Sequence, residues 1–106
     1  MIKVFQKGAY VPPVSENAVA ADFPDFSFGV FRDPAGQVWA DFIHDTDEFV
    51  VVAEGELEIE VAGEVAQCCP GDLVKIPAGA SHSLRTSMNG GSVWYYGYGR
   101  FGGNHD

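Results

Sequence analysis

Apolar and polar residues alternate along the middle of the chain with the two-residue period of a β-strand. Residues 56–61 alternate without a break, so Leu57, Ile59 and Val61 would face a core while the three glutamates between them face water. Nothing between residues 28 and 100 has a convincing helical period. The pattern therefore predicts an all-β domain.

Four glycines divide this region into short segments. Gly55, Gly63, Gly71 and Gly79 follow one another at intervals of eight residues, and each lies in a turn-like context. Short strands separated by turn signals at this spacing are typical of a sandwich or a barrel. The other expected strands are residues 30–32, 37–44 and 92–98.

The strand expected over residues 37–44 has two distinct faces. Successive side chains of a strand point to opposite sides. One face would carry Val38, Ala40, Phe42 and His44, and the other would carry Trp39, Asp41 and Ile43.

The segment before this region is rich in proline and small polar residues. We therefore expect residues 1–27 to form an N-terminal arm and a loop that packs on the barrel. Residues 28–100 would be the barrel domain, and residues 101–106 a flexible tail.

The composition suits one folded domain and limits its partners. The chain has 106 residues, 46% of them hydrophobic, and a formal net charge of −9 from 15 acidic residues against 6 Lys and Arg. This charge argues against nucleic acid and against anionic membranes, because both attract clustered Lys and Arg. No apolar run approaches the ~18 residues that span a bilayer.

Two local features bear on the cellular compartment. The adjacent Cys68 and Cys69 are expected to be reduced thiols, because neighbouring residues rarely reach disulfide geometry without strain. The N-terminus is interrupted by Gln6 and Lys7, so it lacks the apolar stretch of a secretory signal. Together these features predict a cytoplasmic protein.

Three residues with metal-binding chemistry are candidates for one site. His44 and Glu48 are four residues apart, which on one extended strand would separate them by ~13 Å. They can meet at one ion only if the intervening Asp-Thr-Asp turns the chain, as Asp and Thr readily do. His82 follows a separate turn and would open another strand.

These residues carry a resemblance to the cupin family. His44-Asp-Thr-Asp-Glu48, followed by six residues and Gly55, resembles the first cupin motif, G-x5-H-x-H-x3-4-E-x6-G. Gly71-x5-Pro77-x-Gly79-x2-His82 resembles the second motif, in which Thr86 replaces the final Asn. The resemblance spans residues 39 to 86. It implies a single jelly-roll β-barrel, usually dimeric, with a metal held by three His and one Glu.

The first motif departs from the family at one ligand. Phe42 stands where the first His of H-x-H belongs, and Asp41 would face away from the site. The resemblance therefore carries over only His44, Glu48 and His82 as metal ligands, with Phe42 and Val50 expected to line the pocket. Two His and one carboxylate suit Fe(II), and Mn, Zn or Ni are alternatives; no organic cofactor is expected.

Three functions remain open from the sequence. The first is a metal-dependent oxygenase or isomerase that acts on a small polar organic molecule, with no catalytic residue assigned beyond the ligands. The second is a non-catalytic small-molecule-binding protein with a degenerate or empty metal site. The third is an assembly role. The fold alone does not choose between them.

Overall fold

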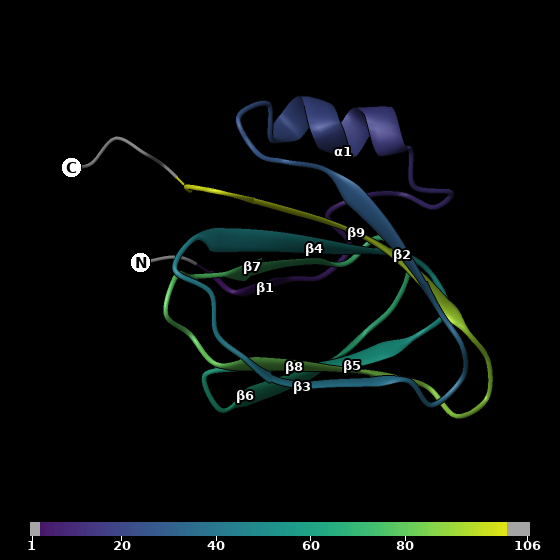
Figure 1. Cartoon of the computed structure of the whole chain (residues 1–106). Helices are drawn as coiled ribbons and strands as arrows, with labels where there is room; N and C mark the ends of the chain where they lie inside the picture. Colours follow the sequence, from purple (N-terminus) through teal and green to yellow (C-terminus); the bar gives the residue numbers. More distant parts are fainter. Residues whose placement is uncertain (1–2, 102–106) are drawn as a thin grey trace.

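The computed structural model describes residues 3–101, which fold into two antiparallel β-sheets and one short helix (Figure 1). The five-stranded sheet has the order β1-β7-β4-β9-β2, and the four-stranded sheet has the order β3-β8-β5-β6. The strands of the first sheet are β1 (Phe5–Gln6), β7 (Leu73–Ile76), β4 (Asp47–Glu54), β9 (Ser92–Gly99) and β2 (Gly29–Asp33). Those of the second are β3 (Val38–Phe42), β8 (His82–Thr86), β5 (Leu57–Val61) and β6 (Glu64–Cys68).

The two sheets lie face to face as in a jelly roll (Figure 1). Over the described range the sheets do not join into a closed barrel, since each strand order begins and ends with an edge strand. The predicted all-β class is confirmed and the arrangement fits a jelly roll, but the sheets form an open two-sheet sandwich and not the closed barrel that the resemblance implies.

The strand and turn pattern of the middle region is also confirmed. Leu57, Ile59 and Val61 of β5 are at most 1% exposed, as their alternation predicts. The four regularly spaced glycines all have positive φ, between 78° and 97°. At Gly55 an added Cβ would stand 2.3 Å from the carbonyl oxygen of Gly91, so this turn requires glycine for space as well as for conformation.

Two hydrophobic clusters hold the layers together. The first lies between the sheets and takes side chains from both; its buried members are Val50, Val52, Leu57, Ile59, Val61, Cys68, Val74, Ile76, Leu84 and Trp94. The second lies on the other face of the five-stranded sheet, where the N-terminal segment covers it; its buried members are Val14, Val19, Phe49, Val51, Leu73, Val93 and Tyr95. Strand β4 contributes to both clusters through its alternating residues.

The segment expected to form an N-terminal arm and a loop over residues 1–27 also contains a short helix. Helix α1 (Glu16–Asp22) lies over the outer face of the five-stranded sheet (Figure 1). Ser15 caps it by accepting a hydrogen bond from the amide of Ala18 at 3.2 Å. The helix has seven residues and buries only Val19, which is too little to give a helical period in the sequence. No helix within residues 3–101 is long and apolar enough to cross a membrane.

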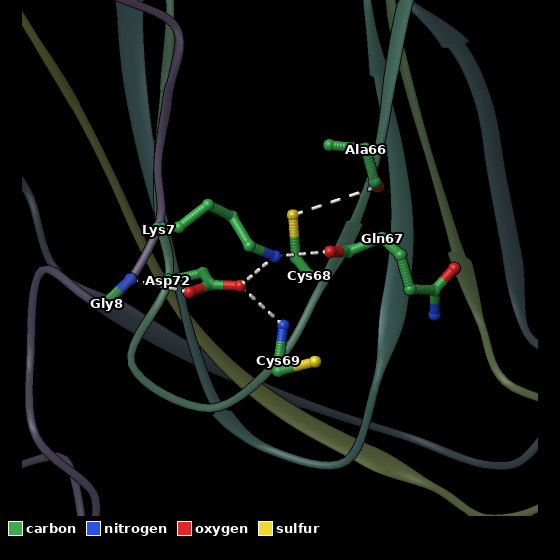
Figure 2. A network of polar contacts seen from close by, with 7 residues as sticks. All are labelled: Lys7, Gly8, Ala66, Gln67, Cys68, Cys69 and Asp72. Atoms are coloured by element: carbon green, nitrogen blue, oxygen red, sulfur yellow. Dashed lines mark hydrogen bonds and ion pairs between the residues drawn. The ribbon is translucent and has the colours of Figure 1, made fainter.

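The N-terminal arm is joined to the sheet by β1 and by a polar network around Asp72 (Figure 2). Asp72 is 5% exposed, and its two carboxylate oxygens accept hydrogen bonds from the amides of Gly8 and Cys69, each at 2.8 Å. Lys7 forms an ion pair with the same carboxylate and donates to the carbonyl of Gln67. The network fastens the arm to the turn between β6 and β7.

The two cysteines are free thiols in different surroundings. Cys68 is fully buried at the end of β6, and Cys69 is partly exposed. Burial raises the pKa of the Cys68 thiol to about 11, so this thiol is protonated at neutral pH. Of the expected C-terminal tail, residues 102–106 lie outside the described residues.

Candidate metal centre

His44, Glu48 and His82 lie together at one end of the two sheets. Each offers a ligand atom, and these atoms are all within 4.8 Å of one another. Nε2 of His82 lies 3.3 Å from Oε1 of Glu48, and Nε2 of His44 lies 3.7 Å from the same oxygen. The structure thus brings together all three residues that the sequence singles out as metal ligands.

Hydrogen bonds between two turns set this arrangement. The carbonyl of His44 accepts a hydrogen bond from the amide of Gly79 at 2.8 Å, in the turn that precedes His82. Oδ1 of Asp47 accepts another from the amide of Ala78, also at 2.8 Å. The chain therefore turns between β3 and β4, as the spacing of the first two ligand candidates requires.

The ring of His82 is held in one orientation. Its Nδ1 lies 3.1 Å from the carbonyl oxygen of Ala80, and because a carbonyl only accepts, Nδ1 carries the proton and Nε2 faces Glu48. The side chain is 3% exposed. Burial alone would lower the pKa of His82, but the facing Glu48 carboxylate and the Ala80 carbonyl outweigh it, so the pKa is raised.

Glu48 has the buried charge that makes this cluster a candidate for a cation. The residue is 4% exposed, and its Oε1 has no hydrogen-bond partner among residues 3–101. A buried carboxylate oxygen without a partner is costly, and a cation between it and the imidazole nitrogens would remove that cost. A carboxylate and two imidazoles are donors that Zn, Fe, Mn and Ni accept. The residues present therefore fit a divalent transition metal.

His44 is the most exposed of the three metal candidates. Its side chain is 32% exposed, against 3% for His82. Its ring meets that of Tyr98 edge to face at 5.1 Å and stacks near that of Phe42 at 6.2 Å. Because 32% of the His44 side chain remains exposed beside these rings, one side of the cluster is accessible from solvent.

The strand that ends at Phe42 does not keep the alternation that the sequence indicates. Trp39 and Phe42 were expected on opposite faces, but both line the same cavity. The pairing of β3 with β8 shifts register between them, and Asp41 has a φ of 60°. Its amide donates to Oγ of Ser83 at 3.0 Å. This β-bulge, which alternation cannot foresee, turns Trp39 inward.

The metal candidates open into a cavity of about 190 Å³. Its lining residues are Phe31, Trp39, Phe42, His44, Glu48, His82, Leu84, Trp94 and Tyr98. Phe42 is there as the sequence predicts. Val50 points inward as expected, but it is not among the lining residues; it is fully buried in the core, paired with Val74 and Tyr96 further along the sheet.

Five lining residues were missed as site residues: Phe31, Trp39, Leu84, Trp94 and Tyr98. The sequence carried a signal for two of them. Trp94 and Tyr98 are separated by an even number of residues along β9 and so face the inside of the sandwich, whereas Tyr95 packs in the outer cluster. Parity alone does not distinguish a cavity wall from an ordinary core position, because both are inward.

Comparison with solved structures supports the same fold. A protein of Thermus thermophilus is similar with a TM-score of 0.65 and 24% identity, over 72% of this chain and 74% of that one. A protein of unknown function from Rhizobium leguminosarum has a TM-score of 0.63 and 25% identity, over 71% and 70% of the two chains. A sugar phosphate isomerase of the cupin superfamily from Silicibacter pomeroyi has a TM-score of 0.64 and 25% identity, over 72% of this chain and 51% of that one.

Comparison with family sequences identifies the domain. No curated protein matches the chain in a search by sequence. The cupin domain family matches residues 29–95, which include all three metal candidates and most of both sheets. This match covers more than half of the chain, and the two-sheet fold and the similar structures agree with it. The chain therefore belongs to the cupin domain family.

Proposed function

We propose that His44, Glu48 and His82 hold one divalent transition metal ion and that the protein is a small metal-dependent enzyme, an oxygenase or an isomerase. The observation that carries the proposal is Oε1 of Glu48, which is buried without a hydrogen-bond partner in the described structure and faces two imidazole nitrogens. Iron, manganese, zinc and nickel all suit this donor set. No organic cofactor is part of the proposal.

Each residue has a distinct part in such a site. A metal ion in this place supplies Lewis acidity toward a substrate oxygen or reactivity with dioxygen. The buried ring of His82 is oriented by the Ala80 carbonyl, which is the kind of second contact that fixes a ligand histidine. Glu48 provides the negative charge, and the half-exposed His44 leaves an approach from solvent.

The cavity beside the three residues provides room for a small organic molecule. Its volume is about 190 Å³, and its aromatic lining would remove part of the surface of the bound molecule from water. The isomerase of Silicibacter pomeroyi supports isomerisation as one activity for this fold. Its substrate is not transferred, because that chain is about twice as long as the part that is similar.

Metal analysis tests the proposal directly. We expect protein purified without chelators, or reloaded after their removal, to hold about one equivalent of a transition metal and to melt at a higher temperature when loaded. Glu48→Gln should hold less than a tenth of an equivalent. The matched control is Glu54→Gln, an exposed carboxylate at the other end of β4, which should load like the wild type. Equal loading of both variants would refute the site.

A second function is favoured by one observation, the phenyl ring of Phe42 beside the two histidines. In that alternative the protein binds a small molecule without transforming it, and the three polar residues contact the ligand directly. Once a substrate is found, one variant distinguishes the two functions. If Glu48→Gln abolishes metal binding and turnover together, the non-catalytic alternative fails.

We also infer that the chain forms a homodimer in the cytoplasm and binds neither nucleic acid nor membranes. The dimer rests on the family resemblance, and the cytoplasmic location rests on the two free thiols. The charge of −9 argues against binding to nucleic acid and to anionic membranes. Light scattering after gel filtration should give twice the chain mass of 11.4 kDa. A mass of one chain at micromolar concentration would overturn the dimer.

A further inference from the structure

Asp33 is a buried carboxylate that the metal centre does not use. It ends strand β2 and is 7% exposed. Its Oδ2 accepts hydrogen bonds from two indole nitrogens, that of Trp39 at 3.0 Å and that of Trp94 at 2.9 Å. Trp39 belongs to the four-stranded sheet and Trp94 to the five-stranded sheet. One carboxylate oxygen therefore ties the two sheets together.

Both of these tryptophans line the cavity of the metal centre, whereas Asp33 lies behind them. The ring of Phe31 fills the space against them, with its centroid 5.7 Å from Trp39 and 4.8 Å from Trp94. A carboxylate acceptor makes stronger hydrogen bonds with the two indole donors than a neutral acceptor would. Asp33 thus fixes the rotation of both indole rings and with it the shape of the wall.

The wall determines what chemistry the cavity accepts. Apart from the three metal candidates, every lining residue is aromatic or aliphatic; these residues are Phe31, Trp39, Phe42, Leu84, Trp94 and Tyr98. Among the described lining residues none is Lys or Arg, so in the metal-free protein a phosphate group in the cavity would lack a counter-charge. A sugar would likewise leave most of its hydroxyls without partners. The volume is that of roughly six water molecules.

We propose that Asp33 is a positioning residue that determines specificity. By holding Trp39 and Trp94 it makes the cavity select a small molecule with a compact apolar body and one oxygen-donor group, and reject phosphorylated sugars. The inference rests on the proposed function only in that it takes the cavity as the ligand site. It replaces the polar substrate that the sequence indicates with a mostly apolar one.

The first test uses the metal-free full-length protein, with phenol as the apolar probe and glucose 6-phosphate as the opposing probe. The chain has two tryptophans, so the two indole N–H signals in a nitrogen-15 NMR spectrum report on the wall itself. We expect phenol to shift both signals of the wild type and glucose 6-phosphate to shift neither. If phenol does not bind, or if the sugar phosphate binds as tightly, the proposal is overturned.

Variants at Asp33 then separate positioning from folding. Asp33→Leu removes the acceptor, and we expect phenol affinity to fall at least about tenfold as the indole signals move. Asp33→Asn keeps one oxygen of similar shape and should lose less. The matched control, Asp72→Asn, removes another buried carboxylate and should bind phenol like the wild type. If Asp33→Leu does not fold, the phenol affinity of Asp33→Asn tests the proposal instead. Unchanged affinity in a folded Asp33 variant contradicts the proposal.

The second test uses Co(II)-loaded protein and two chelators with the same donor group, acetohydroxamate and benzohydroxamate. The visible absorption of Co(II) reports their binding. We expect the wild type to prefer benzohydroxamate by about tenfold, because its ring is buried against the wall, and Asp33→Leu to lose the preference but not the cobalt. If no cobalt binds, the proposed metal function fails, while the phenol titration still decides the role of Asp33.

Discussion

Phe42 and His82 are direct register partners on the neighbouring strands β3 and β8. The Phe42 ring centroid lies 6.3 Å from that of His82 and 6.2 Å from that of His44, beside the metal candidates. A histidine in this place would add the fourth donor that the first motif lacks. Even an outer contact of a ligand is typically worth ~10–100-fold in metal affinity, so we expect Phe42→His to raise metal affinity at least about tenfold.

Competition with a chromophoric chelator measures this change. The matched control is Val38→His on the same strand, where the side chain is 47% exposed and does not line the cavity. It should leave metal affinity unchanged. If the two variants bind metal equally tightly, the position beside His82 has no special value and the proposed centre is misplaced.

The hairpin between β5 and β6 contains a residue that its turn does not favour. Val61 pairs with Glu64, so Ala62 and Gly63 form a two-residue loop, with φ angles of 50° and 88°. A turn with positive φ at both positions prefers Asn-Gly, and Ala pays a steric cost there. We expect Ala62→Asn to raise the free energy of unfolding by about 1 kcal/mol.

Urea unfolding followed by circular dichroism gives this free energy. Ala35→Asn provides the matched control, since it makes the same substitution at another exposed turn residue without a positive φ. It should change the stability by less than ~0.5 kcal/mol. A loss of stability in Ala62→Asn would show that the loop does not require the left-handed conformation.

The network around Asp72 should make stability depend on pH in the acid range. Burial alone would raise the pKa of Asp72, but hydrogen bonds from Lys7 and from the amides of Cys69 and Gly8 outweigh it, so the pKa lies below its usual value of 3.8. A lowered folded pKa stabilises the protein above the unfolded value. This contribution should disappear as the pH falls below 3.8 toward the folded pKa.

Asp72→Asn tests the linkage. At pH 7 it should lower the free energy of unfolding by about 1–3 kcal/mol, because it removes the charge and one acceptor from a buried network. The difference from the wild type should shrink as the pH is lowered below 3.8. Asp25→Asn, at an exposed position, serves as the control. A difference that stays constant from pH 7 to pH 2.5 would exclude a linked proton at Asp72.

The metal candidates could be predicted from the sequence because nearby turns, which local residues encode, set their positions. His44 and Glu48 flank a short polar turn, and His82 follows a turn closed by Gly79, so each is placed by local chemistry that single residues encode. The same holds for β5, whose strict alternation leaves one choice of inward face. Such features need no knowledge of distant contacts.

The wall of the cavity depends on contacts that the sequence does not encode locally. Trp39 turns inward because β3 shifts register against β8, and that shift involves Ser83, which is 42 residues away along the chain from its partner Asp41. The pairing of Asp33 with Trp94 spans 61 residues. Alternation within one strand carries no information on either relationship.

Helix α1 offers the last prediction, because an aromatic ring at its C-terminal end adds to the contact that Val19 makes with the sheet. Phe23 follows the helix and stacks on Phe49 of β4, with ring centroids 4.4 Å apart and planes at 12°. We expect Phe23→Ala to lower the free energy of unfolding by about 2 kcal/mol, because the ring is only partly buried. In hydrogen exchange the amides of α1 should lose protection while those of β4 keep it, and metal loading should be unchanged, since the metal candidates lie on the opposite face of β4. Phe28→Ala, which removes a more exposed ring 6.4 Å from Phe49, should cost less. Equal losses in the two variants, or faster exchange throughout β4, would show that the helix and the sheet unfold as one unit.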